Sequence, residues 1–244
     1  PDTAIFASTS MCRRPETPAY ALAETVVLIP GFAGDKLLDY WNFDALVACF
    51  PGVRFLEVYP GPFSSHHDRA CEIFAMLKGG QVDYGEAHAR EHGHRRFGRT
   101  YPGLLPGDMW DAQRPVVLVG HSLGGVTARL LQQYLHEGAF PGFRTSSAWV
   151  SAIATLSSPH NGDPIVYSLG ASRDACVRGS PHRLRFGSVG HALGLVVHTA
   201  LFACLDRLLG VDLQLDHWRL SLGAGGLSAI AEFARALACR SRLA

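Results

Sequence analysis

The chain has 244 residues, of which 48% are apolar and 18% are charged, and its formal net charge is +1. This composition can build a sizeable folded core. It excludes a disordered tail and a coiled coil, and the near-neutral charge gives no sign of nucleic-acid binding. The six cysteines are scattered without a Cys-x-x-Cys pair, so they establish neither disulfides nor a cellular compartment. Residues 1–23 form a poorly determined leader that lacks the basic, apolar and small-residue order of a signal peptide.

Short apolar runs alternate with helix-like segments from residue 24 onward. The predicted strands cover residues 25–29, 53–59, 115–119 and 148–156. The predicted helices cover residues 42–49, 68–77 and 123–135. This alternation is typical of a parallel sheet with right-handed crossovers, and it predicts one α/β domain over residues 24–244. Residues 79–107 show neither period and are predicted to form a structured loop, and only helix-like segments follow Pro164.

The segment Gly120-His121-Ser122-Leu123-Gly124 fits the pattern G-x-S-x-G. A buried strand leads into it and a helix leads out, which is the context of a nucleophile elbow. Ser122 would sit on a sharp turn, and the flanking glycines would remove side chains that collide there. The alternative is an ordinary Gly-Ser turn before a helix. The pattern favours Ser122 as the nucleophile of an acyl-transfer reaction.

Two backbone N–H groups are candidates for an oxyanion hole. One is that of Leu123, directly after Ser122 and at the start of a helix. The other is that of Phe32, in the glycine-bracketed loop after the first predicted strand. The alternative for Phe32 is an exposed aromatic side chain in a turn.

Three histidines, His88, His92 and His94, lie within seven residues. Their spacing is not that of a His-Glu-x-x-His site. The aspartates that could join them are Asp68, Asp83 and Asp216. Two imidazoles and two carboxylates would make a closed zinc site of structural type. By spacing alone, a metal site and a solvated charged loop remain equally open.

Residues 68–72, 83–94 and 96–106 resemble the thermoalkalophilic bacterial lipases of the Geobacillus type, lipase family I.5. The likeness is close over residues 68–135. It is weaker at three further stretches, residues 30–32, 154–162 and 215–218. It implies an α/β-hydrolase fold with an inserted zinc-binding loop at residues 79–107 and a helical lid region at residues 164–220.

The resemblance also implies functional residues. Structural Zn²⁺ would be held by Asp68, His88, His94 and Asp216, and His92 would not be a ligand. The substrate would be a lipid or another ester, met at a lipid–water interface, and the protein would be secreted. The apolar segment 193–209 would form the lid helix, with a plain buried helix as the alternative; it is too short and too interrupted to span a membrane.

The sequence departs from this family in places that matter for catalysis. Pro30 stands where the family has His, Leu123 replaces Gln, and Gly120 replaces Ala. No residue matches the family's catalytic Asp, catalytic His or calcium ligands. We therefore expect an amino-terminal fragment or a shortened gene model, with late strands missing and with weak or no activity on its own.

The sequence and the resemblance together favour a serine ester hydrolase whose general base and acid lie outside this chain. Three alternatives remain open. A local triad would use Asp206 or Asp212 with His217. A non-catalytic, zinc-binding remnant of the fold would keep the metal without the chemistry. Another acyl-transfer enzyme, such as a thioesterase, would share the elbow, because the elbow does not define the leaving group.

Overall fold

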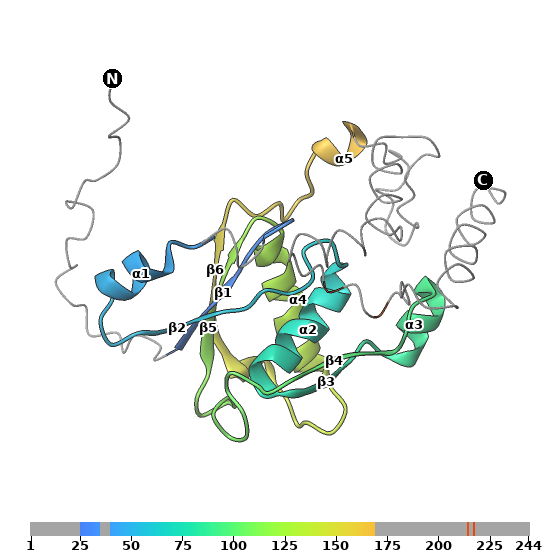
Figure 1. Ribbon diagram of the computed structural model, residues 1–244, viewed down its shortest axis with the longest axis horizontal. Coiled ribbons are helices and arrows are strands. Elements are labelled where there is room, and N and C mark those ends of the chain that lie inside the picture. Colours follow the sequence, from blue (N-terminus) through green and yellow to red (C-terminus); the bar gives the residue numbers. More distant parts are fainter. Residues whose placement is uncertain (1–24, 35–39, 169–213, 215–216, 218–244) are drawn as a thin grey trace, which may run out of the picture.

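The computed structural model describes residues 25–34, 40–168, 214 and 217 (Figure 1). A four-stranded parallel sheet has the order β2-β1-β5-β6. Its strands are β1 (Thr25–Ile29), β2 (Arg54–Glu57), β5 (Val116–His121) and β6 (Val150–Leu156). All four strands were predicted from their short apolar runs. The α/β fold class is confirmed at this level.

Five helices accompany the sheet in the described part of the chain. They are α1 (Phe43–Cys49), α2 (His66–Lys78), α3 (Glu86–His92), α4 (Leu123–Glu137) and α5 (Ile165–Ser168). A 3₁₀ turn, η2 (Ser147–Trp149), leads into β6. Helices α2 and α4 pack on each other, and α4 also packs on β5 and β6. Figure 1 shows α1 and α3 at opposite ends of the molecule.

The core lies between the sheet and the helices α2 and α4. Val27 and Leu118 are fully buried from neighbouring strands, and Leu131 of α4 is buried against them. Trp110 is also fully buried, and its indole N–H donates to Trp149 O over 2.9 Å. Burying such side chains is worth about 1.5–3 kcal/mol each. This packing holds α4 against the sheet.

The prediction of a structured loop over residues 79–107 is wrong in part. Strands β3 (Gly80–Asp83) and β4 (Phe97–Tyr101) pair as an antiparallel hairpin, and α3 lies between them in the chain. These strands have four and five residues and an irregular register, and few of their residues are buried. They therefore leave no alternating pattern in the sequence.

The lid prediction mostly lies outside the described residues. Of the predicted lid region, 164–220, the structure describes residues 164–168, Gln214 and His217, and segment 193–209 is not among them. No helix in the described ranges combines the length and the apolar composition needed to cross a membrane.

Candidate active site and metal cluster

Ser122 lies between the end of β5 and the first residue of α4, as the sequence predicts. Its backbone has φ 52° and ψ −125°, a conformation that side-chain-bearing residues seldom adopt and that is typical of strained functional turns. The Ser122 N–H donates to Leu156 O over 2.8 Å. The turn is therefore anchored to the neighbouring strand.

The two glycines of the motif are required by close backbone contacts. A methyl group at Gly124 would lie 2.7 Å from Pro30 O and closer still to Ile29 O. A methyl group at Gly120 would lie 2.5 Å from the carbonyl carbon of Gly124. Backbone atoms cannot move aside as a flexible side chain can, so both positions exclude a larger residue. The first turn of α4 consequently packs directly on the end of β1.

The loop after β1 reaches Ser122. A methyl group at Gly31 would lie 2.8 Å from Ser122 Cβ, so the backbone just before Phe32 touches the serine. The Phe32 side chain is 53% exposed and meets Phe63 edge to face, with ring centroids 5.2 Å apart. The loop is held by the N–H of Ala33, which donates to Pro62 O over 3.1 Å. Phe32 and the start of α4 thus lie on the same side of the sheet as Ser122.

Tyr40 links this loop to the residue before the serine. The Gly31 N–H donates to the Tyr40 hydroxyl over 3.0 Å, and that hydroxyl lies 2.6 Å from Nδ1 of His121. The His121 ring is therefore directed toward Tyr40. His160, another loop histidine, has Nε2 3.2 Å from Thr155 Oγ1.

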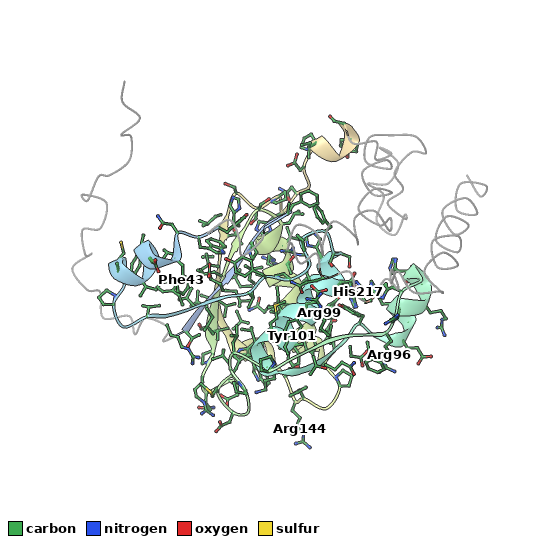
Figure 2. All side chains as sticks on the ribbon, in the orientation of Figure 1. Phe43, Arg96, Arg99, Tyr101, Arg144 and His217 are labelled. Carbon is green, nitrogen blue, oxygen red and sulfur yellow. The ribbon has the colours of Figure 1, made fainter. Side chains whose placement is uncertain are left out.

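A second cluster surrounds Asp68, which lies in the first turn of α2 and is 1% exposed. The Nε2 atom of His88 lies 3.0 Å from Asp68 Oδ1, and that of His94 lies 3.8 Å from the same oxygen. The Nε2 atom of His217 lies 3.8 Å from Asp68 Oδ2. Figure 2 shows His217 between α2 and α3. Burial opposes ionisation of this carboxyl, but the imidazoles of His217 and His88 hold the pKa of Asp68 well below its usual range.

Three of the four predicted zinc ligands thus converge, namely Asp68, His88 and His94. The fourth, Asp216, lies outside the described residues. Its neighbour His217 is 1% exposed, and its carbonyl accepts from the N–H of Arg95 over 2.7 Å. This bond joins His217 to the residue that follows His94.

The chemistry of these side chains fits a divalent cation. The Nδ1–H of His94 donates to Arg95 O over 2.8 Å, so the lone pair of its Nε2 faces the Asp68 carboxylate. Burial lowers the pKa of His94, which keeps the ring neutral as a metal ligand must be. Zinc is commonly bound by carboxylate oxygens together with neutral imidazole nitrogens. In such sites the other ring nitrogen of the histidine usually donates to a carbonyl or carboxylate, as Nδ1 of His94 does here.

His67 is a member of the cluster that the sequence analysis missed. His67, Asp68 and His88 offer ligand atoms within 4.8 Å of one another, and the rings of His67 and His88 stack at 3.7 Å. However, Nε2–H of His67 donates to Tyr84 O over 2.7 Å and its Nδ1 lies 2.7 Å from the Tyr134 hydroxyl. Because both nitrogens have these partners, His67 supports the cluster rather than completing a ligand set.

His92 and Asp83, which lie near the predicted zinc ligands in the sequence, have different surroundings. The exposed His92 has its ring centroid 4.3 Å from that of His88, on the outer side of the cluster. Asp83 forms an ion pair with Arg96, with O–N distances of 2.7 and 2.8 Å. This pair joins the two strands of the hairpin, so the Asp83 carboxylate is committed to a structural role.

A family model described as "Lipase-like, C-terminal domain" matches residues 52–180. The chain is similar to Lipase 2 of Staphylococcus aureus, with 41% identity over 117 residues, which is 41% of this chain and 16% of that protein. It is also similar to Lipase 1 of Staphylococcus aureus strain MRSA252, with 34% identity over 169 residues, 59% of this chain and 25% of that protein. The chain therefore spans no more than about a quarter of these curated relatives.

Two solved structures show the same architecture. Lipase 1 from Pelosinus fermentans has 31% identity and a TM-score of 0.56, and the match covers 83% of this chain and 55% of that one. The Staphylococcus hyicus lipase has 26% identity and a TM-score of 0.57, with 90% and 59% covered.

Proposed function

Because the chain belongs to the family described as "Lipase-like, C-terminal domain", we propose that it is a serine ester hydrolase of lipase type. Its substrates would be carboxylic esters of acylglycerols. The observation that carries the proposal is the strained turn at Ser122, with the loop after β1 packed directly against it. The candidate nucleophile and the candidate oxyanion loop meet where β5 and β1 end, which supports this proposal.

In this mechanism the Ser122 oxygen attacks the ester carbonyl carbon, and its proton passes to a general base. The oxyanion that forms would accept from the N–H groups of Phe32 and Leu123, the second of which starts a helix whose dipole favours negative charge. Collapse of the intermediate releases the alcohol and leaves an acyl group on Ser122. Water then cleaves this acyl-enzyme by the same steps.

We assign the general base neither to His121 nor to His217. Nδ1 of His121 faces Tyr40, and the two ring nitrogens of His217 face Tyr84 and Asp68. No residue of this sequence matches the catalytic Asp and His of the Geobacillus-type lipases. General-base help is worth roughly 10²–10⁴-fold, so we expect the 244-residue chain to hydrolyse esters weakly.

The Asp68 cluster would hold zinc through Asp68, His88, His94 and Asp216, as in the Geobacillus-type subfamily. Bound there, zinc would supply a structural cross-link rather than a reactive centre, since four protein ligands leave no open position. The residues concerned come from the first turn of α2, from α3 and its following turn, and from the segment before His217. Secretion and a lid at residues 193–209 belong to the same proposal.

Ester hydrolysis by the chain and by Ser122→Ala tests this function. We expect slow turnover of p-nitrophenyl butyrate and tributyrin that falls at least about tenfold in Ser122→Ala, since the serine is the attacking group. A matched control is Ser151→Ala, on the neighbouring strand β6, which should keep the wild-type rate.

Other outcomes would favour the rival functions. Preference for a butyryl thioester over the oxygen ester would indicate a thioesterase. A folded, zinc-loaded chain whose ester hydrolysis is the same with and without Ser122 would indicate a non-catalytic remnant.

A further inference from the structure

Helix α2 carries a buried polar face that the proposed chemistry does not use. Arg69 is 2% exposed, and its guanidinium donates to Gly61 O over 3.0 Å and to Pro30 O over 2.6 Å. These acceptors belong to the loop after β2 and the loop after β1. Arg69 therefore ties the two loops together, directly beside the residues that precede Phe32.

Glu72, one turn further along α2, contacts the same loop after β2. It is 1% exposed, and its carboxyl oxygens accept from the Gly61 N–H over 2.7 Å and from the Tyr84 hydroxyl over 3.0 Å. Helix α2 therefore holds both the backbone N–H and the backbone C=O of Gly61. Buried groups of this kind are costly to leave unpaired, so the contacts must form or break together.

Tyr84 connects this network to the metal cluster. Its hydroxyl oxygen lies 3.2 Å from Nδ1 of His217, whose Nε2 lies 3.8 Å from Asp68. The rings of Tyr84 and His217 are packed with centroids 4.4 Å apart. A continuous chain of buried polar contacts thus runs from Asp68 through His217, Tyr84 and Glu72 to Gly61.

We propose that Tyr84, Glu72 and Arg69 form a polar relay that couples metal binding at the Asp68 cluster to the position of the oxyanion loop. They are positioning residues, and the inference rests on the proposed function in that it takes the Phe32 loop as the oxyanion loop. A cation held by Asp68, His88 and His94 fixes the Asp68 carboxylate that faces Nε2 of His217. His217 then fixes the Tyr84 hydroxyl, and through Glu72 and Arg69 the two loops.

Hydrogen–deuterium exchange of the whole chain, with and without zinc, tests the relay through Tyr84→Phe. In the wild type we expect zinc to slow exchange in the segments 29–34 and 58–64 by about fivefold, the effect of one buried hydrogen bond. In Tyr84→Phe the ring and its packing remain and only the hydroxyl is lost. Zinc should then still bind, but exchange in these two segments should no longer depend on zinc.

Tyr134→Phe is the matched control. It also removes one hydroxyl beside the cluster, but this hydroxyl faces Nδ1 of His67 and is not on the path from His217 to Gly61. Zinc should therefore protect both loops as in the wild type. If zinc protects the loops equally in Tyr84→Phe, or does not protect them in the wild type, the relay is overturned.

A second variant keeps the test decisive if Tyr84→Phe fails to bind zinc. Glu72→Gln leaves one acceptor oxygen for two donors, and it should uncouple the loops in the same way. Zinc protection of the loops that persists in Glu72→Gln contradicts the relay. Exchange does not depend on turnover, so a failure of the proposed ester hydrolysis and a failure of the relay are separate results.

Discussion

His94→Ala is expected to reduce zinc affinity by more than about 100-fold, because loss of even an outer partner of a zinc ligand commonly costs 10–100-fold. The His94 ring is buried beside Asp68, and its Nδ1–H is already committed to Arg95 O. Its remaining nitrogen is therefore presented to the cluster. Zinc content of the purified chain, and a chelator titration, measure the loss. We expect about one zinc per wild-type chain, as for a single closed site.

His92→Ala is the matched control for this prediction. It removes the same side chain two residues away, from an exposed position that touches the outer face of the His88 ring. It should retain about one zinc per chain. Equal zinc content in His94→Ala and the wild type would refute the ligand assignment. Equal loss in both variants would show that the loop as a whole, rather than particular ligands, determines binding.

Gly31→Ala is expected to remove most of the Ser122-dependent ester hydrolysis and to lower the rate toward that of Ser122→Ala, because losing one oxyanion-hole donor costs about 10²–10³-fold in a complete site. The added methyl group would lie 2.8 Å from Ser122 Cβ and 3.1 Å from the Tyr40 hydroxyl oxygen. The loop must therefore move away from the serine. That movement carries the Phe32 N–H out of reach of the developing oxyanion.

Phe32→Ala separates the backbone from the side chain at the same loop. It keeps the N–H and removes a ring that is half exposed, so the rate on p-nitrophenyl acetate should fall by less than about tenfold, within what lost packing with the substrate can explain. Urea denaturation of both variants shows whether the fold is intact. The oxyanion assignment fails if folded Gly31→Ala retains the wild-type rate, or if Phe32→Ala is the more damaged of the two.

The sequence predicts the sheet and the Ser122 turn because both depend on local signals. Strands β1 and β5 are short β-branched runs that must be buried, and the glycines at 120 and 124 mark a backbone approach that no larger residue permits. Asp68, His88 and His94 come from the family resemblance, and the structure brings them together.

The missed features depend on tertiary contacts. The β3–β4 hairpin buries Val82 against α2 and is joined by the Asp83–Arg96 ion pair, but most of its other residues are exposed or half-buried. The sequence therefore shows no alternating pattern there. His217 was weighed as a catalytic base, whereas it faces Asp68. Arg69 and Glu72 are of residue types that are seldom buried, and no sequence pattern indicates that these two are. Their burial follows only from the packing of α2 against the loops after β1 and β2.

The most direct test of the central claim is covalent capture of the nucleophile. The chain is incubated with a fluorophosphonate, which transfers its phosphonyl group to an activated serine oxygen with loss of fluoride, and the modified residue is located by peptide mass spectrometry. Because the general base is not assigned within this chain, the account predicts slow labelling under a large excess of reagent, with the adduct on Ser122, present in Ser151→Ala and absent in Ser122→Ala. Labelling of another serine at the same rate as Ser122, or in its place, would contradict it.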